Sequence, residues 1–169
     1  NKIKSLGYSR IDYLVATHPH ADHIGGMTEI INSFDIGEIY MPKVSTTTAT
    51  YENLLDAIAA KGLSIHTAKA GVTIAADNTF NVQIISPKLD DYADINDWSA
   101  IIHYSTASKN VLFTGDASKD VIHDANPGKI DVLKVSHHGS RTGTDEALAT
   151  EPSPAYAVIS CGFNNSYGH

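Results

Sequence analysis

The sequence predicts an α/β fold in a single domain that spans residues 1–169. Short runs rich in β-branched and aromatic residues alternate with segments whose apolar residues recur at helical spacing. Several expected strands also follow one another directly, which favours layers of sheet and helix over a helical bundle. A chain of 169 residues, 42% of them hydrophobic, is long enough for one sizeable core, and it shows no repeat, low-complexity segment or linker.

The first half of the chain predicts five strands and two helices. The run "IDYLVAT" is typical of a buried strand, and Pro42 ends the strand that "IGEIYMP" predicts. Leu54, Leu55 and Ile58 share one face of a helix for which Gly62 is a suitable C-cap. The expected strands are 11–17, 36–42, 63–67, 72–75 and 80–85, and the expected helices are 22–34 and 51–62.

The second half begins with a loop rich in Asp and Asn over residues 88–97. The segments "SAIIHYS" and "NVLFTGD" then predict a hairpin that turns through residues 107–110. The remaining expected elements are helices 118–125 and 144–150 and strands 130–140 and 155–162, of which strand 130–140 carries two histidines.

Bulk properties exclude few classes of function. No apolar run approaches the roughly 20 residues that a membrane-spanning helix needs. The single cysteine, Cys161, excludes an internal disulfide and a zinc cluster built from cysteines. The net charge of −7 argues mildly against tight binding of nucleic acid, although bound divalent cations would add positive charge where a phosphate sits.

Residues typical of metal ligands follow three of the expected strands. The segment "ATHPHADHIGGM" places His18, His20, Asp22 and His23 after the first strand. Asp116 follows the strand in "VLFTGD", and His137–His138 end the strand in "VLKVS". Because strand ends in α/β layers converge on one edge of a sheet, we expect these side chains to meet there.

The spacing suits two metal ions. His18 and His20 are two residues apart, so an extended turn presents both on one side and favours one metal position. Asp22 and His23 open the next helix and favour a second position, and Asp116 has two oxygens with which to bridge them. Imidazole and carboxylate ligands suit Zn, Mn or Fe. The alternative role for Asp116 is that of a helix N-cap.

One histidine of the pair His137–His138 is expected to be a ligand. Side chains alternate along a strand, so neighbours point to opposite sides. Leu133, Val135 and His137 occupy alternate positions, which are expected to point inward from the strand. This favours His137 as the ligand. His138 then remains to support the site or to reach the charge that develops on the substrate.

The motifs "THPHADHIGG", "FTGDAS" and "LKVSHHGS" resemble those of the metallo-β-lactamase superfamily. The longer segments "NDWSAIIHY", "LKVSHHGSRTGT" and "ISCGFNNSYGH" are similar to the hydrolase domain of ComEC-type competence proteins and their free-standing relatives. The resemblance implies an αββα sandwich, which we expect to be incomplete at both ends. It also implies an extracytoplasmic location and, for a ComEC-like protein, a membrane channel partner.

Two positions depart from the superfamily pattern. The superfamily often has a lone histidine before the bridging aspartate, but the matching segment "INDWS" has Asn96 and Asp97 instead. We therefore expect one metal position, the one at Asp22 and His23, to be held less firmly, or a metal to take Asn96 or Asp97. His20 stands where ComEC-like domains often have aspartate, which favours zinc. Expected substrate-binding residues are Asn96, Asp97, Ser140 and His169.

The predicted reaction is hydrolysis by a water activated between two divalent metals, Zn or Mn. The superfamily resemblance implies that Asp22 orients this water, and His138 or His137 is expected to stabilise the developing charge. The resemblance implies a phosphodiester substrate, possibly DNA. Two alternatives stay open: hydrolysis of a lactone, β-lactam or other ester or amide, which the absent middle histidine disfavours, and a non-catalytic metal-binding domain, which the intact first motif disfavours.

Overall fold

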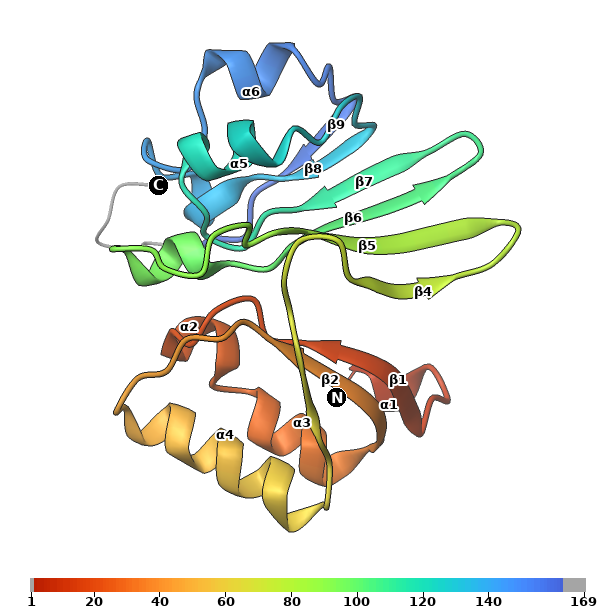
Figure 1. Cartoon of the computed structure of the whole chain (residues 1–169). Coiled ribbons are helices and arrows are strands. Elements are labelled where there is room, and N and C mark those ends of the chain that lie inside the picture. The colour runs from red at the N-terminus through yellow and green to blue at the C-terminus, as the bar shows by residue number, and fades with distance from the viewer. Residues whose placement is uncertain (1, 163–169) are drawn as a thin grey trace.

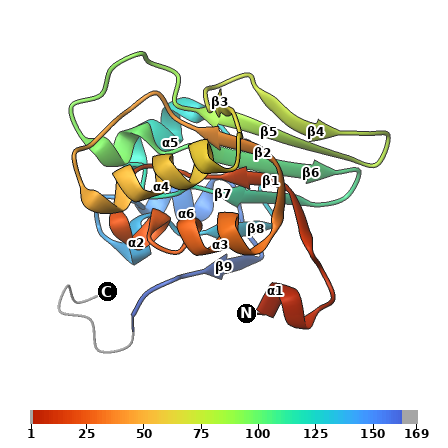
Figure 2. The ribbon, with the colours of Figure 1, turned by 90° about the horizontal axis from the view of Figure 1, so that it is seen from below.

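The computed structural model describes residues 2–162 and arranges them in four layers. Two sheets lie face to face, and helices cover the outer side of each (Figures 1 and 2). This architecture confirms the predicted α/β fold class. None of the helices among residues 2–162 is both long enough and apolar enough to cross a membrane.

The first half of the molecule is built on a three-stranded parallel sheet in the order β1-β2-β3. Its core is made by residues with no exposed surface, Ile24, Ile31, Ile39 and Leu54, which join the sheet to the helices on its outer face. The elements are α1 (Lys2–Ser5), β1 (Arg10–Val15), α2 (Ala21–Ile24), α3 (Met27–Ser33), β2 (Asp35–Met41), α4 (Ala49–Ala60) and β3 (Ile65–Thr67).

The second half is a six-stranded sheet in the order β4-β5-β6-β7-β8-β9. Strands β4 to β7 pair antiparallel, whereas β7, β8 and β9 pair parallel. The strands are β4 (Thr73–Ala76), β5 (Phe80–Ser86), β6 (Ile101–Thr106), β7 (Asn110–Phe113), β8 (Val132–Lys134) and β9 (Tyr156–Val158). The helices are α5 (Lys119–Ala125) and α6 (Glu146–Thr150), with 3₁₀ turns η1 (Ile95–Trp98) and η2 (Ser136–Gly139).

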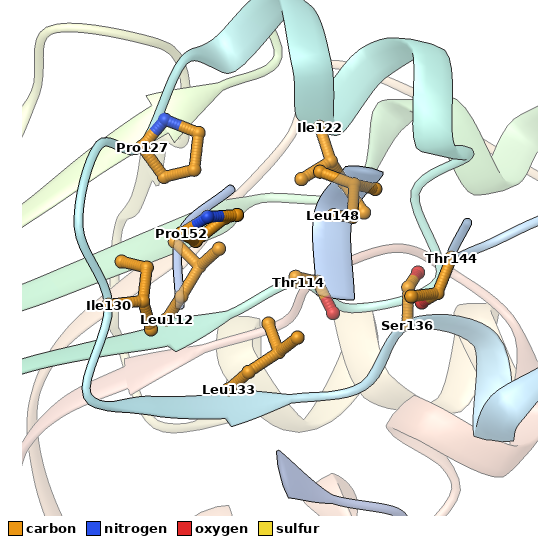
Figure 3. A pocket seen from close by; sticks show the side chains of 10 residues that line it. All are labelled: Leu112, Thr114, Ile122, Pro127, Ile130, Leu133, Ser136, Thr144, Leu148 and Pro152. Carbon is orange, nitrogen blue, oxygen red and sulfur yellow. The ribbon is translucent and has the colours of Figure 1, made fainter. Parts of the chain in front are cut away.

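A small gap in the core lies between the second sheet and its helices. Leu112 and Leu133 from the sheet face Ile122 and Leu148 from the helices around this gap (Figure 3). Its volume of about 10 Å³ is room for at most one water molecule. The gap therefore belongs to the packing of this layer and is not a binding site.

Two expected elements differ from the structure in ways that shape the site. The helix expected over 22–34 is broken into α2 and α3 at Gly25–Gly26, because glycine is a poor helix former. The strand expected over 130–140 ends at Lys134. His137 and His138 both adopt the left-handed conformation, with φ of 48° and 57°, inside η2. The alternation argument for the two histidines was therefore wrong, since neither lies in a strand.

Candidate metal centre

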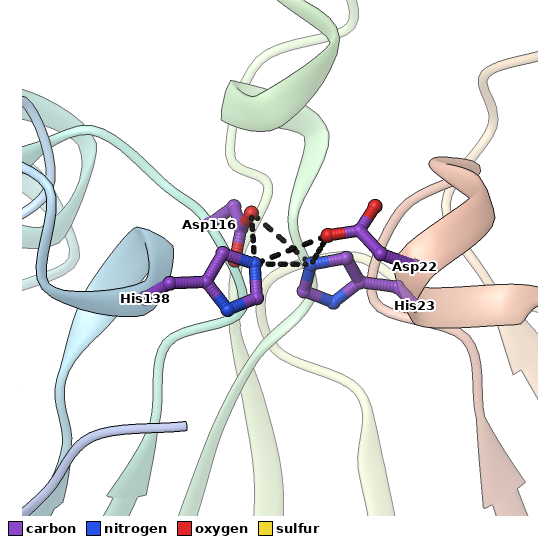
Figure 4. A group of neighbouring side chains, drawn as sticks. All are labelled: Asp22, His23, Asp116 and His138. Atoms are coloured by element: carbon purple, nitrogen blue, oxygen red, sulfur yellow. Dashed lines mark hydrogen bonds and ion pairs between the residues drawn. The ribbon is translucent and has the colours of Figure 1, made fainter. Parts of the chain in front are cut away.

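The predicted ligand residues come from loops that both halves of the molecule contribute. His18, His20, Asp22 and His23 follow β1, at or just before α2. Asp116 follows β7, and His138 lies in the turn after β8. Figure 4 shows Asp22 and His23 reaching toward Asp116 and His138 across the space between the halves. The site is therefore located where the two sheets meet at one edge.

Four of these residues form a compact group of donor atoms. Asp22, His23, Asp116 and His138 each place one ligand atom within 4.8 Å of the other three. The Asp116 Oδ2 atom is 3.1 Å from His23 Nε2 and 3.3 Å from His138 Nε2. The two Nε2 atoms are 3.2 Å apart, and His138 Nε2 is 3.2 Å from Asp22 Oδ2. Nitrogen and carboxylate oxygen atoms that converge in this way suit a divalent cation.

His138, rather than His137, belongs to this group. The Nδ1 atom of His138 is 2.7 Å from the carbonyl oxygen of Ser160, to which only a protonated nitrogen can donate. That bond leaves the lone pair on Nε2, the nitrogen that faces the cluster. His137 has its Nε2 4.0 Å from Asp116 Oδ2 and its Nδ1 3.2 Å from Thr142 Oγ1. We expected His137 at this position, whereas the geometry favours His138.

The first two histidines of the motif make a second group beside the first. His18 Nε2 lies 3.1 Å from His20 Nδ1 and 3.9 Å from Asp116 Oδ2. This group has three candidate donors, whereas the position at Asp22 and His23 has four. We expect the Asp22–His23 position to hold its metal less firmly, but the structure brings more donor atoms together there, because His138 and Asp116 both lie close to it.

The electrostatics of the site favour a neutral His18 and an ionised Asp116. Burial, together with the neighbouring His23, lowers the pKa of His18 to about 3. Burial raises the pKa of Asp116, but the hydrogen bond from His23 and the other nearby histidines lower it further, to about 2. Both groups are therefore in their metal-binding protonation states at neutral pH.

One carboxylate oxygen of Asp116 has no hydrogen bond among the described residues. Its carboxylate is 3% exposed, and its Oδ1 atom accepts no hydrogen bond from any residue in the described range. The nearest cation, the ammonium of Lys134, is 3.9 Å away and donates instead to the carbonyl oxygen of Gly115. A buried carboxylate oxygen without a hydrogen bond is costly. This residue set therefore fits divalent cations, which would supply the missing partner.

The group faces an open cleft of about 1040 Å³. Asn96 and Ser140, two of the predicted substrate-binding residues, line it together with His20, His137 and Thr142. Asp97 does not line it, because its carboxylate accepts a hydrogen bond from the backbone N–H of Ser118 at 2.9 Å. His169 lies outside the described residues.

Comparison with known proteins identifies the family. Residues 2–162 match the model of the family described as the metallo-beta-lactamase superfamily. The chain belongs to this superfamily. The match covers both halves of the molecule and every residue of the two histidine groups.

Curated relatives of this superfamily member include proteins named for competence and recombination. The chain is 30% identical to "ComE operon protein 3" of Bacillus subtilis over 99% of its own length and 22% of that protein. It is 30% identical to "Recombination protein 2" of Haemophilus influenzae over 90% of its length and 18% of that protein. A third relative, "Competence protein ComA" of Neisseria gonorrhoeae, is 25% identical over 99% of the chain and 22% of that protein. The resemblance to ComEC-type proteins is confirmed, and the chain spans about a fifth of the length of these relatives.

Solved structures support the same fold. The metallo-β-lactamase fold protein YhfI of Bacillus subtilis aligns over 94% of this chain and 70% of its own, with a TM-score of 0.53 and 14% identity. CmlA, a diiron β-hydroxylase of Streptomyces venezuelae, aligns over 75% of this chain and 25% of its own, with a TM-score of 0.50 and 18% identity. At such identities the likeness establishes the metallo-β-lactamase fold alone.

Some residues near this superfamily site were not predicted individually, although they lie in the segments "NDWSAIIHY" and "ISCGFNNSYGH". Cys161 and the backbone of Ser160 reach the cleft only because β9 returns beside β8. Ser99 lies beside His18 and Asp116, although it is 81 residues from the first and 17 from the second. A lone serine after a loop has no periodicity or spacing that would have identified it.

Proposed function

We propose that this chain is a metal-dependent phosphodiesterase that acts on DNA or another phosphodiester. The observation that carries the proposal is the four-donor group of Asp22, His23, Asp116 and His138, three of which line an open cleft. The competence relatives support the choice of a phosphodiester within a superfamily whose members act on varied substrates.

Each ligand residue has a proposed place. Asp22, His23 and His138 hold one divalent cation, Zn or Mn, and His18 and His20 hold the other. Asp116 would serve both, since its Oδ2 atom faces His23 and His138 and also lies 3.9 Å from His18 Nε2. When bound, such cations acidify a water molecule and offset the negative charge of the substrate.

Four side chains then have proposed roles around the reaction. Asp22 is the most exposed of the group, at 63%, so its carboxylate is free to accept a hydrogen bond from the attacking water and orient it. His137 lines the cleft beside the group, which suits it to stabilise charge on the substrate. Asn96 and Ser140 offer hydrogen bonds to substrate oxygens.

The cleft itself favours a substrate whose charge the metals offset. Among the described residues that line the cleft, none is lysine or arginine. With a net charge of −7, the chain has no general attraction for a phosphate backbone. We therefore expect cleavage and binding of phosphodiesters to depend on the divalent cations more than on surface charge.

The test compares substrates with Mn²⁺ or Zn²⁺ supplied to the purified chain. We expect cleavage of bis-p-nitrophenyl phosphate and single-stranded DNA, and no cleavage of a chromogenic cephalosporin or a lactone. Asp22→Ala should abolish the activity, and Asp120→Ala on the exposed face of α5 is the matched control. Cleavage of the ring substrates alone would overturn the proposal, and bound metal without any cleavage would favour a binding domain.

From the resemblance to ComEC-type proteins we also propose a location outside the cytoplasmic membrane and a membrane channel partner for this enzyme. Protease accessibility in intact cells and spheroplasts tests the location. Protection from protease in intact spheroplasts would contradict it.

A further inference from the structure

Ser99 lies where the loops of the metal centre come together. It follows η1 and precedes β6, and it has no exposed surface. The next residue, Ala100, donates its backbone N–H to the carbonyl oxygen of Thr17 at 2.8 Å, which ties this segment to the end of β1. Ser99 is therefore held against the residue that precedes His18.

The hydroxyl of Ser99 contacts residues from both halves of the molecule. The backbone N–H of Asp116 donates to Ser99 Oγ at 3.0 Å. The same oxygen is 3.3 Å from His18 Nδ1, the ring nitrogen that faces away from Asp116. A serine oxygen has two lone pairs, so it can accept from both groups at once.

The turn that precedes Asp116 packs directly against Ser99. Gly115 has a φ of +55°, and a Cβ atom built on it would lie 2.8 Å from both Cβ and Oγ of Ser99. Only glycine allows so close an approach in this backbone conformation. The turn and the serine therefore fix each other's positions.

We propose that Ser99 is a positioning residue of the metal centre. Its Oγ accepts hydrogen bonds from the Asp116 N–H and from His18 Nδ1–H. The first bond fixes the carboxylate that both metal positions share, and the second leaves the lone pair of His18 on Nε2, the nitrogen available to a cation. The inference rests on the proposed metal centre and adds to it a residue that makes no contact with the cleft.

Thr17 is the competing candidate for the tautomer of His18. Its Oγ1 atom is 3.1 Å from His18 Nδ1. It belongs to the adjacent residue, however, and has no contact with Asp116 among the described interactions, so it has no means to align the two ligands. The two residues can therefore be distinguished by mutation. Thr17→Val should affect His18 alone, whereas Ser99→Ala should affect both His18 and Asp116.

The experiment measures metal binding rather than activity. Titration calorimetry with Zn²⁺ on the wild type, Ser99→Ala, Thr17→Val and Ser86→Ala gives affinity and stoichiometry. We expect Ser99→Ala to lose about 10- to 100-fold in affinity. Ser86→Ala, which removes another buried hydroxyl that has no hydrogen-bond partner in the described chain, should bind like the wild type. Affinity of Ser99→Ala within twofold of the wild type overturns the inference.

A second measurement tests the proposed tautomer of His18 even where Ser99→Ala does not fold. Long-range ¹H–¹⁵N spectra of the zinc-loaded wild type, with His18 assigned from His18→Gln, report which ring nitrogen is protonated. We expect a proton on Nδ1, and a proton on Nε2 overturns the inference. If the wild type binds no zinc, the proposed function fails with it. If the wild type binds zinc and Ser99→Ala binds equally, only the role of Ser99 fails.

Discussion

The two adjacent histidines of the "SHHGS" turn have different partners for their ring nitrogens. His138 donates from Nδ1 to a backbone carbonyl and turns Nε2 toward Asp22 and Asp116. His137 contacts Thr142 from Nδ1, and its Nε2 is 4.0 Å from the nearest oxygen of Asp116. The left-handed backbone at both residues makes this difference, since it gives neighbouring side chains directions that strand alternation does not.

This difference gives a prediction for two matched variants. His138→Ala should lower the affinity for Zn²⁺ or Mn²⁺ at least tenfold, because it removes one of four donors and leaves Asp116 less well oriented. His137→Ala should change metal affinity by less than threefold and reduce kcat instead. Metal content after dialysis, measured by elemental analysis, separates the two. A larger loss of metal in His137→Ala would restore the original assignment.

At the scale of elements, the turn between β7 and α5 depends on one glycine. Gly115 and Gly128 both have positive φ, of 55° and 69°, but only Gly115 has neighbours within 4 Å of an added Cβ. Gly128→Ala should cost about 1–2 kcal/mol of unfolding free energy for the backbone alone. Gly115→Ala should cost about 2–5 kcal/mol, because the clash with Ser99 adds to the backbone cost. Urea unfolding of both variants measures the difference, and equal losses would show that the turn yields easily.

The start of β7 is joined to the start of β8 by an acidic residue. Asp131 accepts hydrogen bonds from the backbone N–H of Asn110 at 2.8 Å and from Lys109 Nζ at 3.2 Å. The bond from Asn110 and then that from Lys109 lower the pKa of Asp131 below its usual value. A carboxyl group with a lowered pKa in the folded state stabilises the protein above its unfolded pKa, and this contribution is lost as the pH falls.

Asp131→Asn should therefore be less stable than the wild type at pH 7. The difference in unfolding free energy between the two proteins should decrease as the pH falls below about 4. Unfolding by urea at several pH values measures this difference. Asp90→Asn, in the exposed loop before η1, is the control and should show no such decrease. A difference in unfolding free energy that stays constant from pH 7 to pH 3 would mean that the charge of Asp131 does not stabilise the contact between the starts of β7 and β8.

At the scale of the whole molecule, the candidate centre joins the two halves. Its donors come from the β1–α2 loop on one side and from the β7 and β8 loops on the other (Figures 1 and 4). The halves also share a buried cluster between the sheets that includes Tyr40, Ile74 and Ile84. A cation bound to donors from both halves should therefore stabilise the fold as a unit.

Metal should raise the melting temperature by about 5–10 °C when free metal is about 100-fold above its Kd. EDTA should reverse the shift. Asp116→Asn should lose most of it, and Asp120→Asn should keep it, because Asp120 is exposed on α5. Differential scanning calorimetry with and without metal measures the shift. An equal shift in Asp116→Asn would place the stabilising ion elsewhere.

The sequence by itself determined the fold class, the order of most elements and the first motif. Those features depend on local patterns: apolar periodicity, glycine and proline at element ends, and the spacing of His18, His20, Asp22 and His23. It did not reveal α1 (Lys2–Ser5), and it predicted one helix where Gly25–Gly26 separates two.

Only the tertiary structure decided which residues lie together at the candidate centre. The left-handed backbone in η2 directs His138 toward the donor group. The close approach of Gly115 places Ser99 beside Asp116. The carboxylate of Asp97 accepts a hydrogen bond from the backbone of Ser118 and does not line the cleft. Each outcome depends on contacts between segments far apart in the chain. Such contacts follow from how the two sheets pack, which local sequence patterns do not specify.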